Sequence, residues 1–367
     1  MKLSVGVDLH KGQFTVYWRS ESEEIRGWEK YSTTETGYEG FEQKLTSLCD
    51  AGYEAKVAVE STGNTRYFKN RIERLGVPVV VINTLKFKVV TESVKKTDRH
   101  DAETIAEFLE KDMLPEARLC SEKSEELRRV LKTRSVLVRS IVSVKNQIHG
   151  MLLGMGIEIR RSALQSKKAR RRVLNVLAEQ NLTGAAAVPL METIDQLNDQ
   201  VKRLEKLIAE LVVGDRVVEL IMSIPGAGLI TAATIRAYTD DVSRYHGPKQ
   251  YAAYAGLVPW VQDSNQTERH GRITKHGSEE LRTALIQIVM GMVRAKRHTE
   301  KYWLMKRYAM LKGRKGSGRS IVATARKLST IIWHMLTNDE EFDPSRMMNL
   351  GIHQTAMEMQ AAASDAA

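Results

Sequence analysis

The chain has 367 residues, enough for about two or three domains, and 56 Lys and Arg against 45 Asp and Glu leave it a net charge of +11. This surplus favours a polyanionic partner, nucleic acid first and an anionic membrane surface second. Two cysteines (Cys49 and Cys120), a charged N-terminus unlike a signal peptide, and no apolar run of about 18–20 residues argue against a disulfide-stapled, secreted or membrane-spanning protein.

The first third of the sequence is predicted to be α/β, with short β-branched runs separated by helical segments. The expected strands are 3–8, 14–18, 56–60 and 77–83, and the expected helices are 36–49, 65–75 and 98–111. The last strand is a continuous apolar run, which is typical of a strand covered on both faces. We therefore place a first domain at residues 1–123.

From Glu125 onwards the pattern is helical, and the 7 prolines are few for this length. Apolar residues alternate spacings of three and four, as in the a/d seam of a coiled coil: Ile194, Leu197, Val201, Leu204, Ile208 and Leu211. A helical hairpin within one chain and a dimerising coiled coil explain this seam equally well. We expect an all-α region at 124–215, a helical domain at 216–337, and a disordered tail at 338–367.

The helical region contains a strongly basic segment. Residues 124–175 carry thirteen Lys and Arg against three Asp and Glu. A solvated helix surface is usually mixed in sign, so this imbalance favours a track for nucleic acid over an ordinary surface. The predicted contacts are Arg160, Arg161, Lys167, Lys168, Arg170, Arg171 and Arg172.

Four acidic residues fall where functional groups gather in an α/β domain. Asp8 and Glu60 end predicted strands, while Asp98 and Asp101 share one face at the start of a helix. Each has an ordinary explanation alone, and Asp98 by itself is most simply a helix cap. Together the four carboxylates would repel one another without cations between them. Mg²⁺ or Mn²⁺ suits such oxygen ligands, and a two-metal site would act on a phosphodiester.

Two later segments offer candidate DNA contacts. The turn Ile224–Gly228 between two helices presents backbone N–H groups, which makes Gly226 and Gly228 candidate phosphate contacts, although an ordinary interhelical turn explains them too. Residues 260–277 are predicted to form a polar cationic loop. Its Arg272 and Lys275 would hold phosphate. Its Ser264 is either a turn residue or a nucleophile, which requires a base, a metal or charge stabilisation.

These motifs in this order resemble the DEDD transposases of insertion sequences, the family that includes the Piv-type DNA invertases. The segments around Asp8, Glu60 and the pair Asp98 and Asp101 look like that family's four acids. Residues 224–228, 254–259, 271–277 and 325–328 look like its C-terminal domain. The similarity extends from residue 3 to about residue 337.

The resemblance implies an N-terminal domain with a RuvC-like (RNase H-like) fold whose acids hold divalent metal. It also implies that a serine of the C-terminal domain forms a covalent phosphoserine link to DNA, and Ser264 matches that serine by its position after Gly-Leu-Val-Pro. The family's usual loop has a serine pair followed by glycine, whereas this chain has Asp263-Ser264-Asn265. Several members of the family are guided by a structured RNA that their own element encodes.

We therefore expect a DNA recombinase that moves an insertion sequence, acts as a dimer or tetramer paired through the coiled coil, and has no membrane partner. We expect it in the cytoplasm, at the nucleoid, bound to element ends, target DNA and a guide RNA. Ser264 would attack a phosphodiester while metal on the four acids stabilises charge. One alternative is a RuvC-like nuclease in which metal activates water. Another is a non-catalytic coiled-coil nucleic-acid binder.

Overall fold

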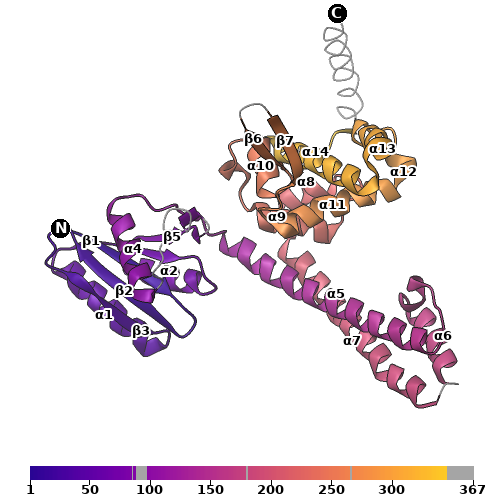
Figure 1. Cartoon of the computed structure of the whole chain (residues 1–367), viewed down its shortest axis with the longest axis horizontal. Helices are drawn as coiled ribbons and strands as arrows, with labels where there is room; N and C mark the ends of the chain where they lie inside the picture. Colours follow the sequence, from indigo (N-terminus) through magenta and orange to yellow (C-terminus); the bar gives the residue numbers. More distant parts are fainter. Residues whose placement is uncertain (85, 88–96, 179–180, 265–266, 345–367) are drawn as a thin grey trace, which may run out of the picture. The chain divides into compact units, whose positions relative to one another are not determined.

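The computed structural model divides into two compact units, Met1–Cys120 and Ser121–Ala367 (Figure 1). The structure describes residues 1–84, 86–87, 97–178, 181–264 and 267–344. Lys95 and Lys96 of the aspartate-pair motif, Asn265, and most of the predicted tail lie outside these ranges. The expected boundary after residue 123 falls in the first turn of a helix, three residues beyond the division between the units.

The first unit is built on a five-stranded mixed sheet with the strand order β3-β2-β1-β4-β5. Its strands are β1 (Lys2–Leu9), β2 (Gln13–Ser20), β3 (Arg26–Ser32), β4 (Glu54–Glu60) and β5 (Val79–Ile82). Strand β2 pairs antiparallel with β1 and β3, while β4 pairs parallel with β1 and β5. The carboxyl ends of β1, β4 and β5 therefore meet at one edge of the sheet.

Helices cover both faces of this sheet. On one face, α1 (Glu35–Asp50) and α2 (Thr65–Glu73) pack with alternate residues of β1, from Leu3 to Leu9, in one apolar core. On the other face, α4 (Asp98–Glu110) crosses β1 and β2. The alternation of strand side chains thus separates the residues of β1 into two sets, and Asp8 belongs to the set that faces α4.

The described residues of the second unit are helical apart from one two-stranded sheet. Its elements are α5 (Glu122–Gly154), η1 (Arg161–Leu164), α6 (Lys167–Ala178), α7 (Asn181–Leu211), α8 (Arg216–Met222), α9 (Leu229–Thr239), η2 (Val242–Arg244), α10 (Pro248–Tyr254), β6 (Pro259–Ser264), β7 (Thr267–Ile273), α11 (Glu279–Arg294), α12 (Lys296–Thr299), α13 (Trp303–Lys315) and α14 (Ser317–Asn338). None of the helices in the described ranges combines the length and the apolar character that a membrane span requires.

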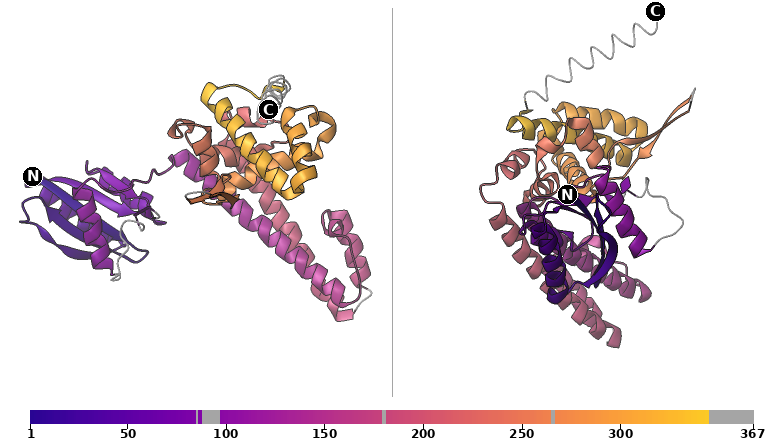
Figure 2. Two further views of the ribbon diagram at one scale, coloured as in Figure 1. Left: turned by 45° about the horizontal axis from the view of Figure 1, so that its top comes forward. Right: turned by 90° about the vertical axis from the view of Figure 1, so that its left-hand side faces the viewer.

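Helices α5 and α7 form a long hairpin that carries η1 and α6 at its far end, and we call α5, η1, α6 and α7 together the arm (Figure 2). Ile194 and Val201 of α7 are buried with Ile141 and Ile148 of α5. The a/d seam is therefore used within one chain, as the hairpin interpretation predicts. Pairing of two protomers through the arm stays a prediction.

Three segments depart from the sequence-based prediction. Strand β3 was not predicted. Residues 260–277, predicted as a loop, form the antiparallel hairpin of β6 and β7, in which the backbone of Ser264 lies opposite that of Thr267. The start of the predicted tail is folded against α8, because Asp339 forms an ion pair with Arg216 and Phe342 is buried in the core of the second unit.

A candidate metal centre and nucleic-acid surface

Asp8 is the residue on which the candidate metal centre is built. It lies near the end of β1 and is only 6% exposed. Val7 pairs in register with Val59 of the parallel strand β4. Asp8 follows Val7 and Glu60 follows Val59, so the two acids lie near the ends of neighbouring strands at the same edge of the sheet. The Thr65 hydroxyl donates a 2.7 Å hydrogen bond to the backbone carbonyl of Glu60 and fixes the turn after β4.

The start of α4 is brought to Asp8 by a glycine in the middle of β1. A Cβ on Gly6 would lie 2.1 Å from the carbonyl oxygen of Ala102 and 2.6 Å from the backbone nitrogen of Ala106. Only glycine lets the helix backbone lie directly on the strand at this point. The first turn of α4, which contains Asp98 and Asp101, therefore begins beside the carboxyl end of β1.

Thr97, not Asp98, caps α4. Its side-chain oxygen accepts a hydrogen bond from the backbone N–H of His100 at 3.3 Å. The interpretation of Asp98 as a helix cap is therefore wrong, and the Asp98 carboxylate, which is partly exposed, is available for another role. From the first turn of α4 it lies close to Asp8 and His10.

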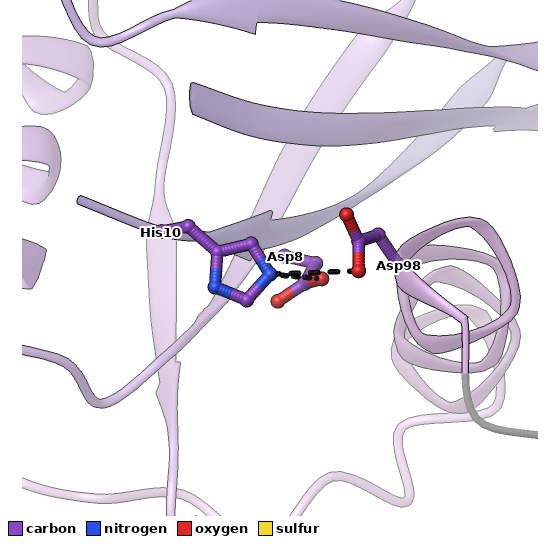
Figure 3. Close-up of side chains that lie close together, drawn as sticks. All are labelled: Asp8, His10 and Asp98. Atoms are coloured by element: carbon purple, nitrogen blue, oxygen red, sulfur yellow. Dashed lines mark ion pairs between the residues drawn. The ribbon is translucent and has the colours of Figure 1, made fainter. Parts of the chain in front are cut away.

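His10 is a member of this centre that the sequence analysis missed. Its Nε2 lies 3.0 Å from Oδ2 of Asp8 and 3.7 Å from Oδ1 of Asp98 (Figure 3). One ligand atom from each of the three residues lies within 4.8 Å of the others. The signal in the sequence was the spacing: residues two apart in an extended chain point to the same side, so His10 accompanies Asp8.

The electrostatics at Asp8 are consistent with the predicted grouping of the four acids. The pKa of Asp8 is raised to about 6, mainly by burial and also by the charges of Glu60, Asp98 and Asp101, while the charge of His10 opposes the shift. Ionised carboxylates crowded in this way favour a cation between them. The donor set, carboxylate oxygens with one imidazole, fits Mg²⁺ and fits Mn²⁺ better, since Mn²⁺ accepts nitrogen more readily.

The basic residues at the far end of the arm divide into two groups. Arg160, Arg161, Lys167, Lys168, Arg171 and Arg172 are exposed, as a nucleic-acid surface requires. Arg170 is 4% exposed: it forms an ion pair with Asp195 of α7 and donates to the carbonyl of Leu164. The prediction that Arg170 contacts nucleic acid is therefore wrong, because its guanidinium joins α6 to α7.

The turn at Gly226 and Gly228 is explained by helix packing. Gly226 has a φ of +89°, and a Cβ there would lie 2.6 Å from the backbone nitrogen of Met292 in α11. The N–H of Gly228 donates to the Thr231 hydroxyl at 2.9 Å. The geometry thus favours the ordinary interhelical turn over a phosphate contact for these two glycines.

The β6–β7 hairpin carries the remaining predicted residues. Arg272 and Lys275 are exposed, and Lys275 has a φ of +55°. Ser264 is the last residue of β6. The side chains of residues 261–270 lie outside the described part of the structure, so Ser264 and Asp263 are placed by their backbone alone.

Comparison with known proteins finds two family matches. Residues 218–304 match the family described as "Transposase IS116/IS110/IS902 family", and residues 5–157 match the DEDD transposase family of the IS110 type, described as "Transposase". Similar proteins include a probable family 20 transposase of Pseudomonas aeruginosa, 27% identical over 78% of this chain and 86% of the relative. The transposase of insertion sequence IS1111A from Coxiella burnetii is 29% identical over 78% of this chain and 79% of its own length.

Proposed function

Since the chain belongs to the IS110/IS116/IS902 family of insertion-sequence transposases, we propose that it cuts and rejoins DNA by transesterification, with Ser264 as nucleophile. Asp8, Glu60, Asp98 and Asp101 hold one or two divalent ions in this proposal. The observation that carries it is the convergence of β1, β4 and the start of α4 on a buried Asp8 whose pKa is raised. The strand order and the helices on both faces support a RuvC-like first unit.

The proposed chemistry conserves phosphoester bonds. The Ser264 hydroxyl gives up its proton and its oxygen attacks the phosphorus of a DNA phosphodiester. One bridging P–O bond of the DNA breaks, and the released DNA oxygen takes a proton to become a hydroxyl. A second DNA hydroxyl then attacks the phosphoserine and restores both the diester and the serine. When bound, a divalent ion would stabilise the negative charge that develops on the phosphate oxygens. Asp8, Glu60, Asp98 and Asp101 would hold that ion in place.

The proposal extends to the partners. The exposed cations at the far end of the arm support binding of nucleic acid, either the DNA of the element and target or a structured guide RNA. The acids and Ser264 belong to different units of the chain, and in this proposal an assembly of two or four protomers completes each site. In this assembly the arm pairs protomers.

A nuclease is the second candidate, because the acid cluster lies wholly within the first unit and contains an imidazole beside Asp8. In that case metal activates a water molecule, no covalent intermediate forms, and Ser264 has no chemical role.

Trapping the covalent intermediate separates these candidates. The full chain is purified from cells that make the element's own transcripts, and any nucleic acid that accompanies it is sequenced. It is then incubated with end-labelled DNA and divalent metal and analysed on a denaturing gel. We expect a protein–DNA adduct from the native chain and from a Ser140→Ala control, and neither adduct nor cleavage from Ser264→Ala or Asp8→Asn. Cleavage by Ser264→Ala would establish the nuclease instead.

A further inference from the structure

Trp260 is an exposed aromatic residue at the start of the β6–β7 hairpin. It is 50% exposed, the most exposed of the five tryptophans, all of which are described. Trp28, the next most exposed, has its ring covered by the guanidinium of Arg99 at 3.3 Å. A tryptophan half open to solvent is unusual, because burying its ring contributes more to stability than burying almost any other side chain.

The indole of Trp260 lies across the neighbouring strand. A Cβ on Gly271 of β7 would lie 2.9 Å from Cε3 of Trp260 and 3.6 Å from its Cβ. Gly271 has no side chain, so the ring rests against its backbone at this point. One side of the indole is therefore supported by β7, and the exposed remainder is left for a second planar group.

Backbone hydrogen bonds join the segments next to Trp260 and Gly271 to each other and to the rest of the second unit. The N–H of Thr274 donates to the carbonyl of Val258 at 2.9 Å, and the N–H of Lys275 donates to the carbonyl of Gly256 at 3.2 Å. The Arg282 guanidinium donates to the carbonyl of Ala255 at 3.1 Å. The backbone on either side of Trp260 and Gly271 is thus anchored before a ligand arrives, which lowers the entropic cost of ordering this segment on binding.

Cations accompany the ring. Arg272 directly follows Gly271, and Lys275 follows three residues later, both exposed. An apolar protein-docking surface would surround a tryptophan with other apolar side chains, whereas the exposed residues that follow Gly271 along the chain include these two cations. An aromatic face beside exposed cations is the combination by which proteins bind single-stranded nucleic acid, with the base on the ring and the phosphates on the cations.

We propose that Trp260 stacks on an unpaired base of the DNA strand that the hairpin binds, while Arg272 and Lys275 contact the adjacent phosphates. This inference rests on the proposed function, because it assigns the bound strand to DNA undergoing cleavage. It adds a requirement that the acids and Ser264 do not impose: the DNA at the hairpin has at least one base outside the helical stack.

Binding of fluorescent oligonucleotides to the full chain tests the inference. The probes are a single-stranded DNA containing 2-aminopurine, the same strand as a blunt duplex, and the same sequence as single-stranded RNA. Stacking of one base on an aromatic ring contributes about 1–3 kcal/mol, so Trp260→Ala should weaken single-stranded DNA binding roughly 5- to 150-fold. It should also abolish the quenching of one 2-aminopurine position, while Trp260→Phe retains most of both signals.

Two further variants serve as controls. Gly271→Ala keeps the indole but displaces it, so it should also weaken single-strand binding, and circular dichroism of each variant establishes that it is folded. Trp28→Ala, in the other unit, should bind like the native chain. The inference is overturned if Trp260→Ala binds single-stranded DNA like the native chain, weakens the blunt duplex equally, or affects RNA alone. Because these measurements require no cleavage, stacking without an adduct would reject the role of Ser264 and leave that of Trp260 intact.

Discussion

The carbonyl oxygen of Ala102 in α4 lies directly over Gly6 of β1, so close that a Cβ on Gly6 would be 2.1 Å from it. This contact determines how near the first turn of α4 comes to the sheet. Asp98 lies about one turn before Ala102 and Asp101 directly precedes it, so the same contact determines how near their carboxylates come to Asp8. The chemistry of the centre thus depends on a residue with no functional group.

Gly6→Ala should separate α4 from β1. We expect the free energy of unfolding of the first unit to fall by about 1–3 kcal/mol, as for overpacked cores, and Mn²⁺ affinity to fall as the carboxylates move apart. Denaturant unfolding and electron paramagnetic resonance of bound Mn²⁺ measure the two effects. The matched control is Gly12→Ala, since Gly12 has open space around it in the described part of the chain. Unchanged Mn²⁺ affinity in Gly6→Ala would contradict this account.

Asp8→Asn should stabilise the metal-free protein at neutral pH. The folded pKa of Asp8 is raised from 3.8 to about 6, so the native chain loses stability as the pH rises from about 4 to 6 and Asp8 ionises. The asparagine variant avoids this loss and should be more stable by roughly 2–3 kcal/mol at pH 8, with no difference below pH 4. Urea unfolding in the presence of a chelator measures this difference in the free energy of unfolding, and amide exchange in β1 reports it locally.

Divalent metal provides the internal check on that prediction. Adding Mn²⁺ at pH 8 should stabilise the native chain and not Asp8→Asn. The difference in stability between the two proteins should therefore shrink or change sign. If Asp8→Asn is instead less stable than the native chain in chelator at pH 8, other groups of the protein stabilise the ionised Asp8 carboxylate and the prediction fails.

Arg170→Met should destabilise the arm without changing how it binds nucleic acid. The guanidinium is buried against Asp195, which is itself partly exposed, so we expect a loss of about 1–3 kcal/mol. Arg171→Gln is the matched neighbour, and it should leave stability unchanged. If Arg171 contacts a phosphate, this variant should reduce the slope of log affinity against log salt by about 0.9 for duplex DNA. Thermal unfolding and binding titrations at several salt concentrations distinguish the two residues.

Asp240→Ala should loosen the start of α5. The Asp240 carboxylate accepts hydrogen bonds from the backbone N–H of Ser121 at 3.2 Å and from the Ser124 hydroxyl at 2.7 Å. Removing these acceptors should cost about 1–2 kcal/mol and speed amide exchange at residues 121–125. Asp199→Ala, which removes only an exposed pair with Lys202, should change neither quantity. Equal exchange rates in the two variants would show that Asp240 does not stabilise the start of α5.

The sequence predicted those elements whose periodicity is unambiguous. Strands β1, β4 and β5 are apolar runs, and α7 has a regular seam. Strand β3 escaped prediction because it is an edge strand of alternating half-exposed residues, Arg26–Ser32, whose pairing with β2 provides the strand character. The β6–β7 hairpin escaped for a similar reason, since its polar and glycine-containing sequence resembles a loop.

Side-chain roles were less predictable than the elements that carry them. Counting charges could not separate Arg170 from its neighbours, although Arg170, Val173 and Leu177 share one face of α6 by their spacing of three and four. The cap of α4 was misassigned by one residue because Thr97 and Asp98 are both good caps. His10 was missed although it lies two residues from Asp8.

The end of the arm nearest to α8–α14 is part of the hydrophobic core of the second unit, and this limits where the arm can be exchanged for that of a relative. Leu127 and Leu131 of α5 are buried among the side chains of α8–α14, together with the seam residue Ile208 and with Val212, which follows α7. A chimera that took its whole arm from a relative would replace four apolar contacts, each contributing about 1.5–3 kcal/mol. A graft joined beyond Leu131 and before Ile208 would leave the recipient's interior intact while exchanging the distal cations.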